Sequence, residues 1–168
     1  MLFFRIKKPL ICCRIDSVKK NGMDWLKDLG RKNVEDLISV IQWNEDNVSH
    51  CIYLRIVLTR SQNIRLFRIS SELFPFASHG TYGYSLDYCA DLLEKAGSLA
   101  LKYGHRLTTH PGQFTQLGSP KPQVVEASIR ELAYHCELLD LMGLGPDSIV
   151  IIHVGHLLVF LFIILSIL

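Results

Sequence analysis

Three of the seven histidines, His79, His110 and His153, follow or end stretches that we expect to be β-strands. His110 comes directly after the β-prone run 106–109, and His153 ends the apolar run 148–153. In parallel α/β enzymes the chemistry lies at the carboxyl ends of the strands. Three imidazoles converging there would suit a borderline divalent ion such as zinc or manganese. The alternative for His110 is a histidine that only caps its strand with a hydrogen bond, and the pattern leaves both roles open.

The loop after His110 holds two further candidates, Gln113 and Phe114. Pro111 has no N–H to continue a strand, and Gly112 permits a sharp turn. The turn should therefore hold Gln113 and Phe114 away from the strand, on a loop of the kind that carries function. For Phe114 the alternative is a buried side chain that anchors the loop.

The elements that must position these residues repeat along the chain. The expected strands begin near residues 64, 106 and 148, so successive strands start 42 residues apart, and each interval contains one amphipathic helix. Such β-α units form parallel neighbouring strands joined by crossovers. The pattern predicts an α/β fold, a partial TIM (β/α) barrel, with a doubly wound open sheet as the alternative. A complete barrel needs about 250 residues, so we expect roughly the first half of one.

The individual elements are predicted from caps and periodicity. Residues 10–15 are expected to form a first strand, and Asn33 is a plausible N-cap for a helix that runs to about residue 44. A second helix should run from about residue 86 to 103 and end at Gly104. A third should follow residues 119–122 and bury one apolar stripe, made of Val125, Ile129, Leu132, Ala133, Cys136 and Leu139. The continuous apolar run 148–153 is typical of a strand covered on both faces.

Composition sets broad limits. The chain has 168 residues and a formal net charge of +2, which neither requires nor excludes a nucleic-acid partner. Its five cysteines form no C-x-x-C pair, so we expect reduced, mostly buried thiols. Residues 1–10 are too short an apolar run for the core of a signal peptide, so there is no clear signal peptide.

Long stretches of the chain resemble the UV-damage endonucleases of the UvdE type. The resemblance covers most of residues 11–47 and 63–155. It is carried by FRISSELFPFASH at 67–79, YGHRLTTHPGQFTQLGSP at 103–120, YHCELLDLMG at 134–143 and IVIIH at 149–153. WLKDLGRKNVEDL at 25–37 and WNED at 43–46 are also similar to that family.

The resemblance implies a TIM-type barrel that holds a cluster of divalent metals, usually manganese, with magnesium or zinc as alternatives. It implies hydrolysis of the phosphodiester bond immediately 5′ of a UV photoproduct in double-stranded DNA. By that likeness His79, His110 and His153 would be metal ligands, and Gln113 and Phe114 would probe the lesion, where many relatives carry tyrosine in place of phenylalanine. It leaves the catalytic residues unassigned. The nucleus is the expected compartment, with mitochondria as the alternative, and no obligate protein partner is evident.

Two stretches depart from the family pattern. Residues 48–62 interrupt a segment that the family runs almost straight through, and residues 156–168 form an apolar tail after the family-like residues 1–155. We interpret both stretches as retained introns, which sequencing of the transcript across the junctions would test. The family keeps its carboxylate ligands in the half that we expect to be missing. The chain is therefore expected to be a truncated, N-terminal portion that is inactive by itself.

Two other functions stay open at this point. Another metal-dependent barrel enzyme, such as a sugar isomerase, would share the histidines, although a small-sugar pocket has no use for a protruding Phe114. A non-catalytic membrane-associated fragment would rest only on residues 157–168, which are uncharged but shorter than the roughly 20 apolar residues of a spanning helix. We therefore expect no membrane partner.

Overall fold

The computed structural model describes residues 14–54 and 65–153 of the chain. Helices and strands follow one another in the order expected of β-α repeats after a long first helix. They are α1 (Ile15–Leu54), β1 (Leu66–Ile69), the 3₁₀ turn η1 (Asp87–Cys89), α2 (Ala90–Lys102), β2 (Arg106–Thr109), α3 (Pro122–Leu141) and β3 (Ile149–Val150).

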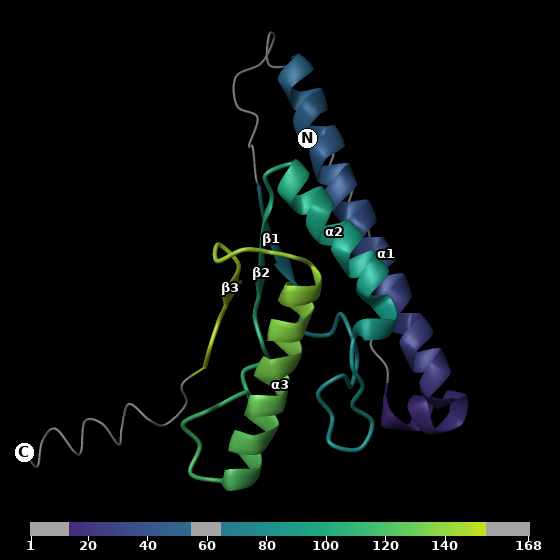
Figure 1. Cartoon of the computed structure of the whole chain (residues 1–168), viewed down its shortest axis with the longest axis vertical. Coiled ribbons are helices and arrows are strands. Elements are labelled where there is room, and N and C mark those ends of the chain that lie inside the picture. The colour runs from purple at the N-terminus through teal and green to yellow at the C-terminus, as the bar shows by residue number, and fades with distance from the viewer. Residues whose placement is uncertain (1–13, 55–64, 154–168) are drawn as a thin grey trace, which may run out of the picture.

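The three strands form a parallel sheet in the order β1-β2-β3. Arg68 is aligned with Thr108, and Thr108 is aligned in turn with Ile149. Each strand is followed or preceded by a helix that returns the chain to the same end of the sheet, and Figure 1 shows the three helices gathered on one side of it. The predicted repeat of parallel β-α units is therefore confirmed.

The two faces of the sheet differ in what covers them. Ile69, Leu107 and Thr109 are buried on the face packed by the helices. Side chains alternate along a strand, so the neighbouring residues point to the opposite face, which carries no helix among the described residues. On that open face lie Leu66, Arg68, Thr108, His110, Ile149, Ile151 and His153, all exposed or half-buried.

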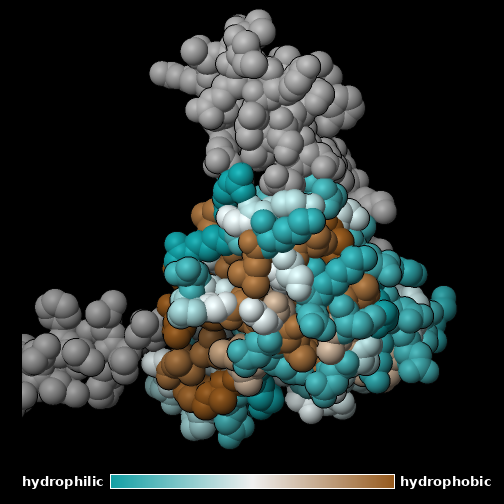
Figure 2. All heavy atoms as spheres, turned by 45° about the horizontal axis from the view of Figure 1, so that its top comes forward, coloured by the Kyte–Doolittle hydropathy of each residue, from teal (hydrophilic) through white to brown (hydrophobic). Residues whose placement is uncertain are grey.

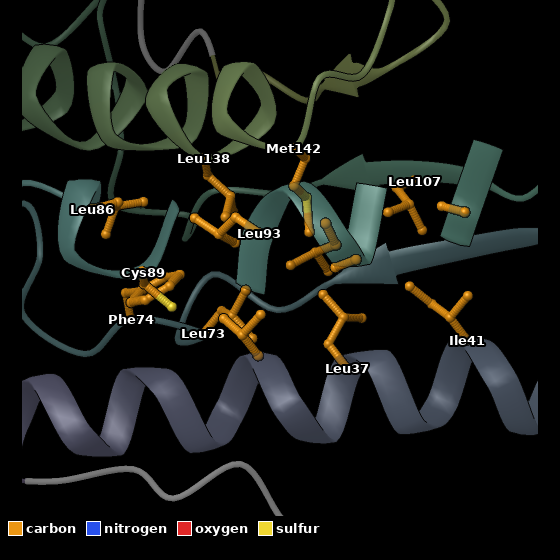
Figure 3. Close-up of a cluster of buried hydrophobic side chains, with 14 of the residues drawn as sticks. Leu37, Ile41, Leu73, Phe74, Leu86, Cys89, Leu93, Leu107, Leu138 and Met142 are labelled. Atoms are coloured by element: carbon orange, nitrogen blue, oxygen red, sulfur yellow. The ribbon is translucent and has the colours of Figure 1, made fainter. Parts of the chain in front are cut away.

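The core lies between the helices and the covered face of the sheet. Figure 3 shows Leu93 of α2 in the middle of the core. Leu138 and Met142, at the end of α3, lie above it, and the α1 side chains Leu37 and Ile41 lie below. The burial of each such side chain contributes about 1.5–3 kcal/mol to the free energy of folding. Gly97 is required where α2 meets the end of α3, because a Cβ atom there would lie 1.8 Å from the carbonyl oxygen of Met142.

The first helix differs from the prediction. Asn33 is not an N-cap but lies inside α1, which begins at Ile15 and has non-helical angles at Gly22. The side chain of Asn33 is 2% exposed, and its amide donates a hydrogen bond of 2.9 Å to the carbonyl of Leu73. The cap-like pattern at Asn33 thus reflects a buried tertiary hydrogen bond. Of the strand predicted at 10–15, Ile15 is helical, and residues 10–13 lie outside the described residues.

The buried stripe of α3 was also predicted wrongly. The residues that face the core are Ser128, Tyr134, His135, Leu138 and Leu139, of which only Leu139 belonged to the predicted stripe. Ile129 is 55% exposed. The polar members can be buried because Ser128 donates to the carbonyl of Val124, and the Nε2 of His135 lies 3.3 Å from Glu131. Apolar periodicity therefore selected the adjacent face of the helix.

The third strand is less covered than predicted. Ile149 and Ile151 are exposed because they point to the face that carries no helix in the described part of the chain, and Ile152, which lies beyond the edge strand β3, is exposed as well. Figure 2 shows large hydrophobic areas interrupting the polar surface at the lower left of the view.

The described residues also bear on two smaller predictions. Cys89 is buried and Cys136 is exposed, and neither forms a disulfide within the described part of the chain. In residues 14–54 and 65–153 no helix combines the length and the apolar character needed to span a bilayer. The apolar tail and most of the 48–62 stretch lie outside the described residues, although the backbone of α1 stays helical to Leu54.

Candidate metal and DNA-binding site

The sheet brings two of the three predicted histidines into contact. His110 follows β2 and His153 follows β3, and their Nε2 atoms are 3.0 Å apart. The two rings are stacked, with centroids 5.0 Å apart and an interplanar angle of 25°. A parallel bridge between Gln116 and His153 fixes the chain beyond β3 beside the loop that follows His110. The sequence prediction that strand ends would bring these two imidazoles together is therefore confirmed.

The environment of His110 favours its neutral form. Burial lowers the pKa of His110, and the positive charge of Arg68 and the neighbouring His153 lower it further. A neutral imidazole offers a lone pair to a metal, whereas an imidazolium does not. The Nδ1 atom of His110 is buried without a hydrogen-bond partner among the described residues.

The geometry of the pair fits a shared divalent ion. Two nitrogen ligands about 2.1 Å from an ion lie about 3 Å apart at the right angle of octahedral coordination, close to the 3.0 Å between the Nε2 atoms. The tetrahedral geometry of zinc would place them about 3.4 Å apart. Without an ion, one ring must donate its Nε2 proton to the other. His110 and His153 therefore fit as two ligands of one metal.

His79 is placed differently from the other two histidines. Its Nδ1 accepts hydrogen bonds from the backbone N–H of Thr81 at 3.1 Å and of Tyr82 at 3.2 Å. A neutral ring that accepts at Nδ1 carries its proton on Nε2, which then has no free lone pair. In the part of the chain that the structure describes, no three or more His, Cys, Asp or Glu side chains are grouped to hold a metal. The role of His79 as a third ligand stays a prediction.

The loop that carries Gln113 and Phe114 is closed by a hydrogen bond of its own and tied to α3 by a second one. The N–H of Thr115 donates to the carbonyl of Gly112 at 2.9 Å, and the N–H of Gln116 donates to Oγ of Ser128 at 2.7 Å. Phe114 is 79% exposed on this loop. The alternative that Phe114 is a buried anchor is therefore wrong, and its neighbour Thr115 is buried instead.

A cleft of about 490 Å³ runs beside Phe114. One wall is the segment after β1, with Phe76, Ser78, His79 and Gly80, and the other is formed by α3 and the Phe114 loop. The cleft thus places Phe114 and His79, two of the predicted site residues, on one surface.

A carboxylate joins the two walls of this cleft. Ser78 donates a hydrogen bond to Glu131 of α3, and the other carboxylate oxygen of Glu131 lies 3.3 Å from Nε2 of His135. Burial alone would raise the pKa of Glu131, but the hydrogen bonds with His135 and Ser78 outweigh it and lower the pKa. The carboxylate of Glu131 is therefore charged, and it links α3 to the segment that carries His79.

Arg68 is a site residue that the sequence did not single out. It lies on the open face of the sheet, aligned with Thr108, two residues before His110 on the neighbouring strand. Within the described residues its side chain forms no hydrogen bond or ion pair, and its positive charge lowers the pKa of His110. The sequence pattern could have indicated Arg68. The alternation of residues 64–70 puts it on the same face as His110 once the strands are known to be parallel neighbours.

The fold and the site together define the class of protein. It is a partial α/β barrel that carries a histidine pair at one lip and an exposed aromatic loop beside that pair. The family model described as UV-endonuclease UvdE matches residues 7–157. The chain belongs to the UvdE family, as its motifs indicated.

Individual relatives agree with the family match. The chain is 43% identical over 157 residues to a UV-damage endonuclease of Schizosaccharomyces pombe, which covers 89% of this chain and 24% of the relative. It is 45% identical over 139 residues to the UV-damage endonuclease of Neurospora crassa, covering 80% and 19%. The chain thus spans about a quarter or less of these two relatives.

A solved structure supports the fold. The crystal structure of SacUVDE superposes with a TM-score of 0.68 and 27% identity, covering 83% of this chain and 42% of SacUVDE. The prediction of a partial barrel is confirmed by this neighbour together with the parallel sheet.

Proposed function

We propose that this chain forms the metal-binding and lesion-probing part of a DNA-repair endonuclease that cuts the phosphodiester bond 5′ of UV photoproducts. The observation that supports the proposal is the contact between His110 and His153 at the lip from which the exposed Phe114 projects. The names of the relatives add the substrate class, which is UV-damaged DNA.

His110 and His153 would hold a divalent cation, which we propose to be manganese, with magnesium or zinc as alternatives. A bound divalent ion supplies a Lewis acid for phosphate oxygens and lowers the pKa of a water molecule. The protein contributes two neutral imidazoles that two adjacent strands hold at fixed separation. His79 becomes a third ligand if its ring gives up the backbone hydrogen bonds at Nδ1 and carries its proton on that atom. The lone pair of Nε2 is then free for the metal.

Gln113 and Phe114 would test the duplex at the lesion. Phe114 is an exposed ring on an anchored loop, so its insertion at a base step costs little ordering of the protein. A damaged step is poorly stacked and therefore cheaper to open than an intact one. The loop can thus bind damaged duplex better than intact duplex without reading its sequence.

Arg68 would bind the phosphate that lies at the histidine pair. A guanidinium can donate two parallel hydrogen bonds to a phosphate, and its charge offsets the charge that develops in the reaction. Its position on the same face as His110 supports this role.

A hybrid enzyme tests the proposal. Residues 66–153 of this chain, which hold every proposed site residue, would replace the matching stretch of the Schizosaccharomyces pombe relative. Irradiated and unirradiated plasmids would then be incubated with the hybrid and manganese. We expect nicking that depends on irradiation and on the metal, and that is lost in His110→Ala. A folded hybrid that binds manganese but nicks both plasmids alike would contradict the proposal.

A further inference from the structure

Arg130 lines the same cleft as Phe114 and His79. It lies on α3, where its Nε donates to the carbonyl of Ser78 at 3.4 Å. A Cβ atom at Gly80 would be 3.7 Å from Nη2 of Arg130, so the guanidinium extends along the backbone of the opposite wall. The side chain is exposed, and the contact of its Nε with Ser78 holds it against the opposite wall of the cleft.

The charge of Arg130 is not neutralised within the described residues, where no carboxylate pairs with it. Glu131 also lines the cleft, but its two oxygens are bound by Ser78 and His135. Only the Nε of Arg130 is used by a hydrogen bond, which leaves the Nη donors of its fork free. A cleft that contains an exposed aromatic ring and an unpaired guanidinium suits a ligand that carries both an anionic group and flat rings.

We propose that Arg130 binds a backbone phosphate of the DNA strand whose bases meet Phe114. The inference rests on the proposed function and assigns the affinity for the strand and the recognition of the lesion to two different residues. A phosphate contact is the same in damaged and intact duplex, so Arg130 adds affinity for both. Phe114 adds affinity only where stacking is disturbed.

The test separates these two contributions in the hybrid enzyme. Fluorescence anisotropy measures Kd for a duplex with one thymine dimer and for the same duplex undamaged, over a range of salt concentrations. Arg130→Gln is compared with Arg130→Lys and with Lys95→Gln, which removes one positive charge from an exposed position on α2 outside the cleft.

We expect Arg130→Gln to weaken binding to both duplexes about tenfold, as for loss of one hydrogen bond to a charged group. The slope of log K against log salt should fall by about 0.9, the value for one phosphate contact. Arg130→Lys should keep the slope, because the positive charge remains. Phe114→Ala should instead lower the ratio of the two affinities and leave the slope unchanged.

Equal Kd values and slopes for Arg130→Gln and Lys95→Gln would overturn the inference. A loss confined to the damaged duplex would overturn it as well, because Arg130 would then recognise the lesion. The same titrations on the complete 168-residue chain, with thermal unfolding of every variant, show whether a loss of affinity reflects a loss of folded protein. Failure of the parent hybrid to nick irradiated DNA would contradict the proposed function alone, since binding is measured separately.

Discussion

The Nε2 atoms of His110 and His153 lie 3.0 Å apart although 43 residues separate the two histidines in the chain. The parallel pairing of β2 with β3 creates this contact, because it carries both strand ends to one lip of the sheet. The pair therefore forms wherever the β2-α3-β3 unit is folded, and its metal affinity can be tested independently of activity.

The first prediction concerns this pair. His110→Ala and His153→Ala should each lower manganese affinity at least tenfold, because even supporting residues around a metal site are worth about 10–100-fold. Manganese electron paramagnetic resonance of the hybrid gives the free ion directly. Gln113→Ala on the same loop is the matched control and should bind as the parent does. Unchanged affinity in both histidine variants would remove them as ligands.

The exposed ring of Phe114 gives the second prediction. Phe114→Ala should reduce the preference for nicking damaged over intact duplex by about 5- to 140-fold, because base–aromatic stacking is worth about 1–3 kcal/mol. Phe114→Tyr should retain the preference, since the ring is kept. Competition between irradiated and unirradiated plasmid measures the ratio, and the manganese content should not change. Equal preference in Phe114→Ala and the parent would exclude the probing role.

The anchor of that loop gives a third prediction. Ser128→Ala removes the acceptor of the Gln116 N–H, and a buried donor without a partner costs about 1–3 kcal/mol. We expect faster hydrogen exchange at the Gln116 amide and a smaller lesion preference, with the His110 and His153 metal affinity largely kept. Ser119→Ala, which removes an exposed hydroxyl that accepts from Lys121, serves as the control. Protection at Gln116 equal to that of the parent would show that Ser128 does not hold the loop.

Two glycines give a prediction for stability. Gly97→Ala should destabilise the fold by about 3 kcal/mol, the upper end for overpacking, because its Cβ would meet backbone of Met142 that cannot move aside. At Gly145 a Cβ would meet nothing within 4 Å, so Gly145→Ala should change stability little. Urea unfolding of both variants decides the point. Similar midpoints would show that α2 and the end of α3 are not in close contact.

The sequence predicted the elements that local rules govern. Alternation and turn residues located β1 and β2, Gly104 closed the second helix as its positive φ requires, and the histidine pair followed from the strand ends. What failed depended on partners distant in the chain. The buried face of α3 contains Ser128, which is hydrogen-bonded to Val124 and Gln116, and His135, which lies beside Glu131. Asn33 bonds to Leu73, 40 residues away. The exposure of Ile151 reflects an edge strand, which no local pattern distinguishes from a central one.

Cleavage beside a single defined lesion tests the central claim most directly. An end-labelled duplex with one thymine dimer would be incubated with manganese and, in parallel, with the 168-residue chain and the hybrid enzyme. We expect the hybrid to cut only the bond immediately 5′ of the dimer. The chain itself should cut nothing, because its described residues bring together no three metal ligands. Cutting elsewhere, or equal cutting of the undamaged duplex, would contradict the assignment of this segment to lesion-directed incision. Dimer-dependent cutting by the 168-residue chain, abolished by His110→Ala, would show that the described half of the barrel suffices.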